Sequence, residues 1–313
     1  MPQMNTSQAR VVDPILTAVA RGYTSQKAAV ANVLFPIVRT GQRAGRIIKF
    51  SGDSFKLMST ARAPGAATKR VQFGYSSETY SLVDYRLEGA VPTELMEEAA
   101  AVPGLDLGAS AIRQVQDIIA LERENKAATL ARNASNYGAG SKATLSGTDQ
   151  WSNAASNPFT VIETAKEAIR SQTGERPNVM VLGPKVLSAL RVHDKVLSRL
   201  STASDRNPAT LAQLAALFEI DQIVEGGAVY QTDAGAIADV WGKDAILAYS
   251  TPRSMQEMGS PSFGYTYQLT DRPMVEEAYF GNNESTWYYP YTDAYQPVIA
   301  GSVAGYLVKD AVA

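Results

Sequence analysis

Residue types that do chemistry are few in this sequence, and those present are poorly placed for catalysis. There is one histidine, His193, and no cysteine. The lack of cysteine excludes disulfides, thiolate metal ligands and a cysteine nucleophile, and a single imidazole argues against a zinc site. His193 falls between Leu190 and Leu197 on the apolar stripe of a predicted helix. We therefore interpret it as a core or interface histidine rather than a catalytic one.

Short catalytic and nucleotide-binding motifs are also missing. The segment Gly138–Lys142 is like half of a phosphate-binding loop, but its glycines lack the required spacing. The carboxylate pairs Glu97/Glu98 and Glu276/Glu277 are sequence neighbours, so their side chains point to different sides of a helix or strand. They are better explained as solvated or inter-subunit charge than as an acid–base pair. We predict no catalytic, cofactor-binding or metal-binding residue and no enzyme activity.

Charge is distributed unevenly along the chain. Residues 1–75 carry eleven positive and two negative side chains, a net charge of +9, which leaves −11 for the rest of a chain whose net charge is −2. Such halves would attract each other between subunits. Two other interpretations stay open, namely nucleic-acid binding and a solvated basic arm. The interpretation as nucleic-acid binding has less support, because the basic residues are spread out and no aromatic residues are interleaved with them.

The overall composition is that of a globular protein. A chain of 313 residues with 45% hydrophobic residues can bury a sizeable core. The first residues have no apolar signal-peptide core, and no run of about 18 apolar residues occurs. We expect neither secretion nor a membrane span, and a protein that is made and kept in a cytosol.

The basic half predicts an arm followed by a long hairpin. Residues 1–44 look irregular, with a short helix at Pro14–Ala20 and an apolar plug at Leu34 and Phe35 that is anchored in its own core or in a neighbour. Residues 45–91 predict one β-hairpin with strands 46–50 and 71–91 and a tip at 61–70 rich in turn formers. Its arms of about 20 residues would reach about 65 Å. A hairpin this long needs a surface to lie on, and another copy is the simplest.

A long helix and an α/β region follow. Residues 105–132 predict a helix with Asp106 or Ser110 as its cap, and residues 133–157 a loop around Trp151. The apolar stripe of that helix is Ile112, Val115, Ile118, Ile119 and Leu121. From Pro158, helices alternate with strands. The predicted helices are 158–173 with a Thr160–Glu163 capping box, 184–200 and 207–218, and the predicted strands are 178–182, 223–224, 228–230, 236–241 and 245–249. Residues 262–296 return to β texture, and 297–313 predict one more strand pair.

This order of segments is similar to a known family. The segment Thr173–Leu190, which continues through Val192–Lys195, resembles sequence segments of phage head proteins. The segment Asp149–Ser152, followed by Asn157-Pro158, is also similar to them. Over residues 30–313 the chain resembles the major capsid proteins of tailed bacteriophages, which have the Hong Kong 97-like α+β fold. The resemblance rests on the order of the predicted helices and strands and on one long sequence segment, not on a catalytic signature.

The resemblance implies four parts. They are an N-terminal arm (1–44), an extended loop (45–91), a peripheral domain with the spine helix (92–157 and 262–296) and an axial α/β domain (158–261 and 297–313). Subunits would form pentamers and hexamers that close an icosahedral head around double-stranded DNA, bound without sequence specificity. The chain lacks the long helical scaffolding segment of some relatives, so a separate scaffold, joined to a protease or not, is expected beside a portal and decoration proteins. The implied location is the virion, after assembly in the bacterial cytoplasm, with no cofactor.

The candidate contact residues follow from the charge asymmetry and the apolar plug. They are Leu34, Phe35, Arg46, Lys49, Arg62, Lys69, Arg70, Glu276, Glu277 and Glu284. A cross-link between Lys69 and Asn282 or Asn283 is conceivable, since some relatives form one. The competing interpretations are an encapsulin-type nanocompartment shell, an α/β hydrolytic enzyme, and another virion part such as a tail tube or decoration protein.

Overall fold

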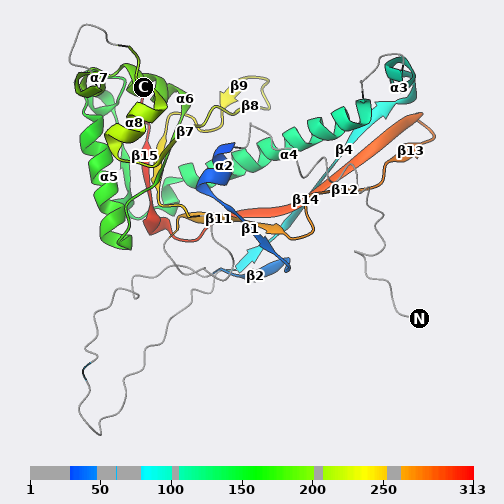
Figure 1. Cartoon of the computed structure of the whole chain (residues 1–313), viewed down its shortest axis with the longest axis horizontal. Coiled ribbons are helices and arrows are strands. Elements are labelled where there is room, and N and C mark those ends of the chain that lie inside the picture. Colours follow the sequence, from blue (N-terminus) through cyan, green and yellow to red (C-terminus); the bar gives the residue numbers. More distant parts are fainter. Residues whose placement is uncertain (1–28, 48–60, 62–78, 101–105, 201–206, 252–261) are drawn as a thin grey trace.

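The structure is a computed structural model that describes residues 29–47, 61, 79–100, 106–200, 207–251 and 262–313. Figure 1 shows a compact α/β body on one side and a long helix lying on an extended sheet on the other. The predicted helix Pro14–Ala20 and residues 62–70 of the hairpin tip lie outside the described residues.

The α/β body is built on a five-stranded sheet in the order β5-β15-β10-β6-β7. Its strands are β5 (Lys142–Thr144), β15 (Gly305–Lys309), β10 (Ala245–Ala248), β6 (Val179–Leu182) and β7 (Gln222–Glu225). The helices are α5 (Pro158–Thr173), α6 (Pro184–Val192), α7 (Asp194–Leu200) and α8 (Leu211–Phe218). Every residue of β6 and β10 is buried, as expected for central strands that are covered on both faces. The apolar faces of the helices and the sheet share one core that includes Trp151 and Ile162.

The extended sheet is centred on its longest strand, β14, which pairs with four others. Its strands are β1 (Ile37–Thr40), β4 (Val83–Pro92), β11 (Gly264–Leu269), β12 (Met274–Val275), β13 (Tyr279–Gly281) and β14 (Thr286–Ile299). The helix α4 (Leu107–Arg132) lies along it, with Ile112, Val115 and Ile119 packed on Tyr291 and Tyr295. At about 1.5 Å per residue, the 26 residues of α4 span about 39 Å. Its N-terminus is capped as predicted, because Asp106 accepts the Ala109 N–H at 3.0 Å.

The last turns of α4 join the two parts. Ala127, Ala128 and Ala131 pack with the short helix α2 (Ala29–Leu34) and with Trp241 in a second core cluster. Small side chains let the elements approach closely here. The remaining described elements are smaller. They are β2 (Ala44–Arg46), β3 (Thr79–Ser81), β8 (Val229–Gln231), β9 (Ile237–Asp239), α3 (Thr93–Ala100) and the 3₁₀ turns η3 (Ala134–Asn136), η4 (Ala139–Ser141), η5 (Gly147–Asp149) and η7 (Ser302–Ala304).

The predicted hairpin is only partly present. Its base is correct, since β2 and β3 pair antiparallel with Gly45 opposite Tyr80. The prediction that the return strand runs on to Val91 as part of the hairpin is wrong. From Val83 onward the chain pairs with β14 along all ten residues of β4. A sequence pattern shows that a strand exists but not which distant strand it joins.

Several local predictions also need correction. The helix predicted over 184–200 breaks at His193 into α6 and α7. The capping box at Thr160 is wrong, because the N-cap is Asn157 and Glu163 binds Lys166 instead. The segment 133–157 contains strand β5 and several turns rather than a plain loop.

Two edges of predicted elements differ as well. The tail adds one strand, β15, because residues 297–299 belong to β14. Ile118, predicted on the buried stripe of α4, has 50% of its surface exposed. The left-handed end of α5 at Gly174 (φ 75°) is as predicted, since glycine adopts this conformation without steric cost.

Candidate subunit-contact surfaces

The base of the hairpin, formed by β2 and β3, packs on the extended sheet beside β1. The rings of Tyr80 and Tyr267 stack with centroids 4.2 Å apart, and the Tyr80 hydroxyl lies 3.0 Å from Thr40 Oγ1. Gly45 lets this stack form, since a Cβ there would lie 2.8 Å from the Tyr80 ring. Burial raises the pKa of Tyr267 to about 12. A packed aromatic pair therefore holds β3 against the extended sheet.

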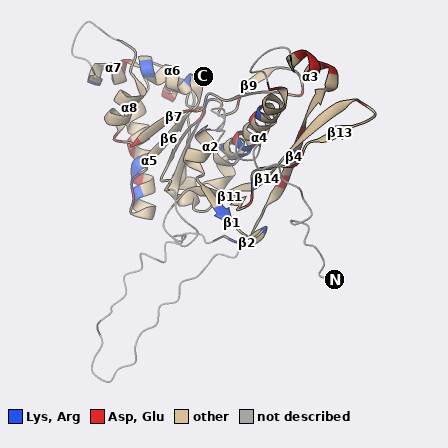
Figure 2. Ribbon diagram, turned by 45° about the vertical axis from the view of Figure 1, so that its right-hand side comes forward, with Lys and Arg blue, Asp and Glu red and all other residues tan. Residues whose placement is uncertain are grey.

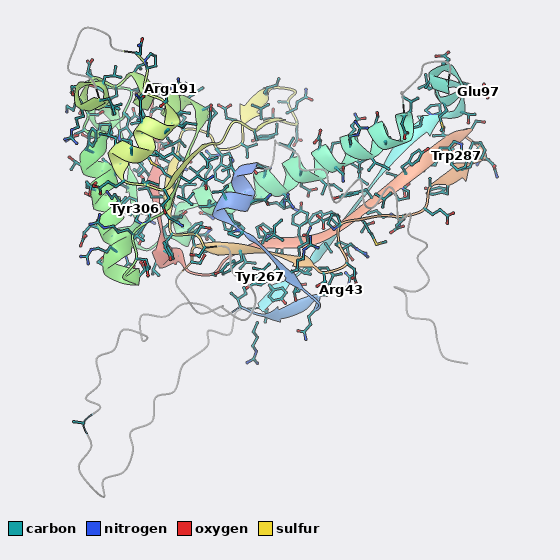
Figure 3. All side chains as sticks on the ribbon, viewed as in Figure 1. Arg43, Glu97, Arg191, Tyr267, Trp287 and Tyr306 are labelled. Atoms are coloured by element: carbon teal, nitrogen blue, oxygen red, sulfur yellow. The ribbon has the colours of Figure 1, made fainter. Side chains whose placement is uncertain are left out.

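The outer side of this part of the molecule, called the basic base below, carries positive charge. Arg39, Arg43 and Arg46 are all exposed. Arg43 pairs with Asp84 at 2.6 Å, with both side chains about half exposed. The Arg39 guanidinium donates to the carbonyl oxygens of Thr270 and Arg272 at 3.3 Å each. Figure 3 shows Arg43 and Tyr267 together at this place.

The opposite end of the extended sheet is acidic. α3 carries Glu94, Glu97 and Glu98, all exposed, and no basic residue. It is tied to the β13–β14 turn because the Thr93 N–H and hydroxyl both donate to Ser285 O, at 3.0 and 2.7 Å. Figure 2 shows this concentration of acidic residues on α3, and Figure 3 shows Glu97 and Trp287 at the same end of the molecule.

Glu284 adjoins Ser285, so four carboxylates gather at this acidic tip, defined as Glu94, Glu97, Glu98 and Glu284. None of the four is ion-paired with another described residue. The ten-residue strand β4 separates the tip from the basic base by about 30 Å. One subunit cannot bring these two surfaces together.

Two aromatic pairs stiffen the same end of the sheet. Tyr279 stacks on Tyr288 and Phe280 lies against Trp287, with ring centroids 5.3 and 5.4 Å apart. Tyr279 and Phe280 remain 46% and 41% exposed. The Tyr279 hydroxyl donates to Glu88 at 2.7 Å, and this hydrogen bond raises the pKa of Tyr279.

Buried charges hold the two parts of the molecule together. Glu124 is fully buried and accepts hydrogen bonds from Ala31 N–H at 2.9 Å and from Trp241 Nε1 at 2.6 Å. Burial raises its pKa, against the lowering effect of both hydrogen bonds. Asp293 is also buried, and desolvation raises its pKa although Gln268 donates to it. Glu124 thus joins α2, α4 and the segment before β10 through one carboxylate.

A second junction lies at Asp244, which has 1% of its side chain exposed. It accepts Arg132 Nε at 2.7 Å and Asp310 N–H at 3.0 Å, with Lys309 Nζ at 3.7 Å. The same guanidinium donates to Val240 O at 2.8 Å. The end of α4 is thereby fixed to both β10 and β15.

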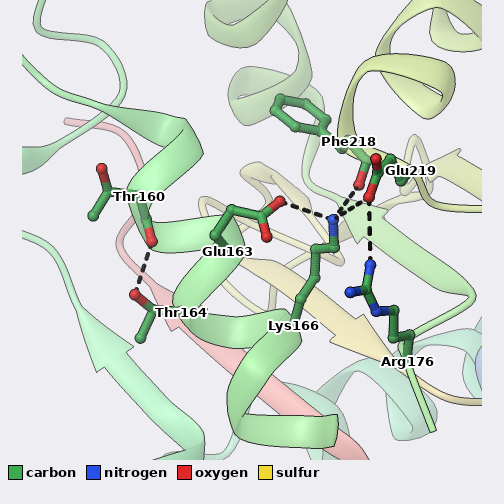
Figure 4. A network of polar contacts seen from close by, with 7 residues as sticks. All are labelled: Thr160, Glu163, Thr164, Lys166, Arg176, Phe218 and Glu219. Atoms are coloured by element: carbon green, nitrogen blue, oxygen red, sulfur yellow. Dashed lines mark hydrogen bonds and ion pairs between the residues drawn. The ribbon is translucent and has the colours of Figure 1, made fainter.

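Lys166 forms a third buried polar group, inside the α/β body. Its ammonium donates to Glu163 at 2.8 Å, to Phe218 O at 3.0 Å and to Glu219 at 3.2 Å (Figure 4). Arg176 Nη1 lies 3.5 Å from the same carboxylate oxygen, Glu219 Oε2. Because all three ammonium protons are used and one meets the last carbonyl of α8, the group serves packing of α5 on α8 and not ligand binding.

Comparison with known proteins identifies the chain. Residues 121–287 match the model of the family described as phage major capsid protein E. The chain is 33% identical over 307 residues to the major capsid protein of Burkholderia phage BcepMu, covering 97% of both proteins. The chain belongs to the phage major capsid protein family. The role of this capsid protein is structural, as a component of the virion shell.

Solved structures agree with this assignment. A phage-related protein from Bordetella bronchiseptica RB50 is 41% identical to the capsid protein, with a TM-score of 0.80 over 97% of this chain and 98% of that one. The capsid of cyanophage P-SCSP1u is 11% identical, with a TM-score of 0.57 over 92% and 89% of the two chains, and supports the fold alone. The predicted α+β, Hong Kong 97-like capsid fold is confirmed.

The structure separates the contact residues predicted for the capsid protein into three groups. Leu34 and Phe35 are fully buried in its own core, where Phe35 lies 5.4 Å from the ring of Phe263. Their assignment as inter-subunit contacts is wrong, because no surface remains for a neighbour. Glu276 is largely satisfied within the chain, since it pairs with Arg86 at 3.1 Å and accepts from Thr292 at 3.2 Å.

The second group is exposed and stays available as predicted contacts. It consists of Arg46, Glu277 and Glu284. The third group, Lys49, Arg62, Lys69 and Arg70, lies outside the described residues. Sequence reasoning missed the acidic tip, although the segment Thr93–Ala100 contains three glutamates and no base. The sequence signal was present, but only the Thr93–Ser285 contact places Glu284 beside it.

His193 ends α6 and is buried at the α6–α7 junction of the capsid protein. Its Nε2 lies 3.1 Å from Ser156 Oγ and 3.3 Å from Asn153 O, which outwardly resembles a catalytic dyad. However, Nδ1 accepts the Lys195 N–H at 3.2 Å. With Nδ1 as the acceptor, Nε2 is the ring nitrogen that donates, so it is not placed to act as a base toward Ser156. The histidine positions the junction.

Over the described ranges, no group of three or more His, Cys, Asp or Glu side chains is arranged to hold a metal ion. Among the helices in the same ranges, none has the length and hydropathy needed to cross a bilayer.

Proposed function

We propose that this capsid protein closes, as pentamers and hexamers, into an icosahedral phage head that encloses double-stranded DNA. The observation that carries the proposal is the match to a phage major capsid protein over nearly the full length of both chains. The many contacts that each subunit makes in such a shell are individually weak, and they add through closed symmetry.

Charge supplies the proposed docking between neighbours. The basic base and the basic hairpin beyond it would bind the acidic tip of the next subunit, because the two surfaces are about 30 Å apart within one chain. The proposed basic contacts are Arg46, Lys49, Arg62, Lys69 and Arg70. The proposed acidic contacts are Glu277 and the four carboxylates of the acidic tip.

The proposed division of labour keeps four parts. Residues 1–44 act as an arm and 45–91 as the extended loop, although Val83–Val91 also lie in the extended sheet. Residues 92–157 with 262–296 form the peripheral domain, and 158–261 with 297–313 form the axial domain. The strand β14 (Thr286–Ile299) continues across the proposed boundary at 296, so the proposed peripheral and axial domains would share one strand there.

The proposed partners are other copies of the chain, a portal, a scaffold with or without a protease, and decoration proteins. Packaged DNA would be met through its phosphates and without sequence preference. Assembly in the bacterial host cytoplasm is proposed as well. No enzyme activity is proposed, because in the Ser156–His193 pair of the described residues the ring nitrogen nearest the hydroxyl is a donor and not a base.

A charge-reversal experiment tests the docking. Variants E94K, E97K and E98K are combined in one chain, and particle yield is measured by sedimentation and negative-stain microscopy. The matched control reverses Asp221, Glu225 and Asp233, which are exposed on the α/β body and change the net charge equally. We expect particle loss only in the α3 variant, with both variants folded by circular dichroism. Equal yields from the two variants would contradict docking on α3. Reversal of Arg62, Lys69 or Arg70 should likewise impair particles more than folding.

The alternatives have direct tests. An encapsulin-type shell would contain cargo protein, whereas a phage head contains DNA, so the contents of purified particles decide between them. A broad hydrolase screen tests an α/β hydrolytic enzyme. For the cross-link of Lys69 to Asn282 or Asn283, a single band near 33.6 kDa on a denaturing gel of particles excludes it.

A further inference from the structure

The outer edge of β4 is a strand edge that no other described strand pairs with. β4 pairs with β14 over ten residues, from Val83 opposite Tyr295 to Pro92 opposite Thr286. The strands β11, β12 and β13 pair with the same strand, so they occupy its other edge. Among the described strands, β4 therefore ends the sheet on its own side.

Backbone hydrogen bonds show which residues of β4 point outward. Glu276 N–H donates to Pro290 O, so the even-numbered residues of β14 direct their backbone N–H and C=O groups toward β12. The odd-numbered residues, such as Tyr291, direct theirs toward β4. Tyr291 is opposite Leu87, which makes the odd-numbered residues of β4 its bonded partners. The even-numbered residues thus direct their N–H and C=O groups away from β14. Consistently, Leu82 N–H donates to Arg43 O at 2.8 Å, on the β2 side.

The outward-pointing residues of this edge are Asp84, Arg86, Glu88 and Ala90. Within the described ranges, no backbone or side-chain group bonds to their amides. β2 covers the edge at β3, and Pro92, which has no N–H, closes the other end. The open stretch has the length of a short strand, and such edges bind further strands.

We propose that this edge pairs with the same edge of a second copy, antiparallel across a two-fold axis centred on Leu87. In that register Asp84 lies opposite Ala90 of the second copy and Arg86 opposite Glu88, so that all four outward residues of both copies are paired. The two Arg86–Glu88 pairs bring opposite charges together, and Leu87 meets Leu87 at the axis. Antiparallel neighbours of these kinds stabilise a sheet.

Neighbouring registers are unfavourable because they place like charges opposite each other or bring the second copy against β2. A register centred on Arg86 would face Arg86 with itself and Asp84 with Glu88, and one centred on Glu88 would face Glu88 with itself. A register centred on Tyr85 would bring the second copy against β2, which already occupies the edge. Like charges placed directly opposite each other destabilise a strand pair. Of these four registers, the one centred on Leu87 is the one that places opposite charges opposite each other without a clash with β2.

The spacing of the helices fits the same arrangement. α4 packs across both β4 and β14, on one face of the sheet. Two paired β4 strands would bring the two α4 helices to roughly twice the strand spacing, or about 10 Å, which is an ordinary distance for packed helices. Leu87 and Ile118, which are 37% and 50% exposed, would lie in the seam or beside it.

This contact rests on the proposed shell function, but it is distinct from docking of the basic hairpin on the acidic tip. It is isologous, using one surface twice, whereas the docking joins two different surfaces. The two can fail separately.

Cysteine cross-linking tests the register, because the chain has no cysteine of its own. Leu87 would form a non-hydrogen-bonded pair with its copy, with Cα atoms about 4.5 Å apart, within reach of a disulfide. We expect L87C to give a dimer band at about twice 33.6 kDa on a non-reducing denaturing gel after mild oxidation of particles. V83C is the matched control on the same face of the strand. Its two copies would be about 27 Å apart and should not cross-link.

Both variants are oxidised as particles and as unassembled subunit, so the result does not depend on shell formation. A dimer from L87C alone supports the proposal. No dimer from L87C in either preparation overturns it, as does a dimer from V83C. If wild type forms no particles at all, the proposed function fails on that ground, whatever the cross-linking shows.

A charge pair at one exposed site tests the contact without cysteine. Ala90 would face Asp84 of the second copy, so A90K should strengthen the contact and A90D should weaken it. Across two symmetric pairs the two variants should differ on the order of tenfold in dimer association, measured by sedimentation of the unassembled subunit. Equal association of the two variants would refute the register.

Discussion

The junction at Asp244 allows a quantitative test of how the spine helix is held. The change D244N keeps the size of the side chain and removes its charge. Asparagine can still accept the Asp310 N–H, but its amide NH₂ would then face the Arg132 Nε–H. Two donors would meet where, in the wild type, Arg132 Nε donates to Asp244 at 2.7 Å. The end of α4 would lose its ionic attachment to β10 and β15.

The expected cost follows from burial. Breaking a buried ion pair costs about 3–5 kcal/mol when the remaining charge stays buried. Here the Arg132 side chain is 30% exposed and can recover part of its hydration, so we expect D244N to lower the free energy of unfolding by about 2–3 kcal/mol. The surface pair Glu167–Arg170 is the control, and E167Q should change stability little, since both side chains are largely exposed.

Urea unfolding of the unassembled subunit, followed by tryptophan fluorescence, measures both effects. Trp241 is buried three residues before Asp244 and reports on this region. In a double-mutant cycle with R132M, the double variant should lose clearly less unfolding free energy than the sum of the two single losses, because each change removes the same interaction. The reasoning is refuted if D244N costs no more than E167Q, or if the effects of D244N and R132M are additive.

Three further predictions concern other parts of the molecule. G89A should destabilise the subunit by about 1–3 kcal/mol in urea unfolding, because its Cβ would lie 2.8 Å from Ala111 Cβ and push α4 off the sheet; a neutral effect would contradict that close approach. Because the pKa of Glu124 is raised above 4.5 in the folded state, its contribution is fully present below pH 4.5 and is lost as pH rises through the folded value. The stability of wild type relative to E124Q should therefore fall as pH rises above 4.5, and a flat or rising difference in unfolding titrations would be inconsistent with the buried carboxylate. G174A should lower the melting temperature, at a cost of about 1 kcal/mol, because alanine is strained at φ 75°; an unchanged melting temperature would show that the end of α5 relaxes.

The sequence determined the features whose causes are local. Asp106 caps α4, Gly174 ends α5, and the apolar stretch Val179–Leu182 forms a buried strand, because each depends on residues within a few positions of one another. The resemblance to phage capsid proteins was also readable, since it lies in the order of segments and one long phrase. The lack of cysteine excluded disulfides, thiolate metal ligands and a cysteine nucleophile without any structure.

Only the tertiary structure decided which distant segments meet. It paired β4 with β14, about 200 residues away, and so removed Val83–Val91 from the predicted hairpin. It buried Leu34 and Phe35 in the subunit's own core and brought Glu284 beside α3. The physical reason is that strand pairing and core burial depend on contacts between residues far apart in sequence, whereas periodicity and capping record only the near ones. The open edge of β4 became visible only when the hydrogen bonds of its other edge were known.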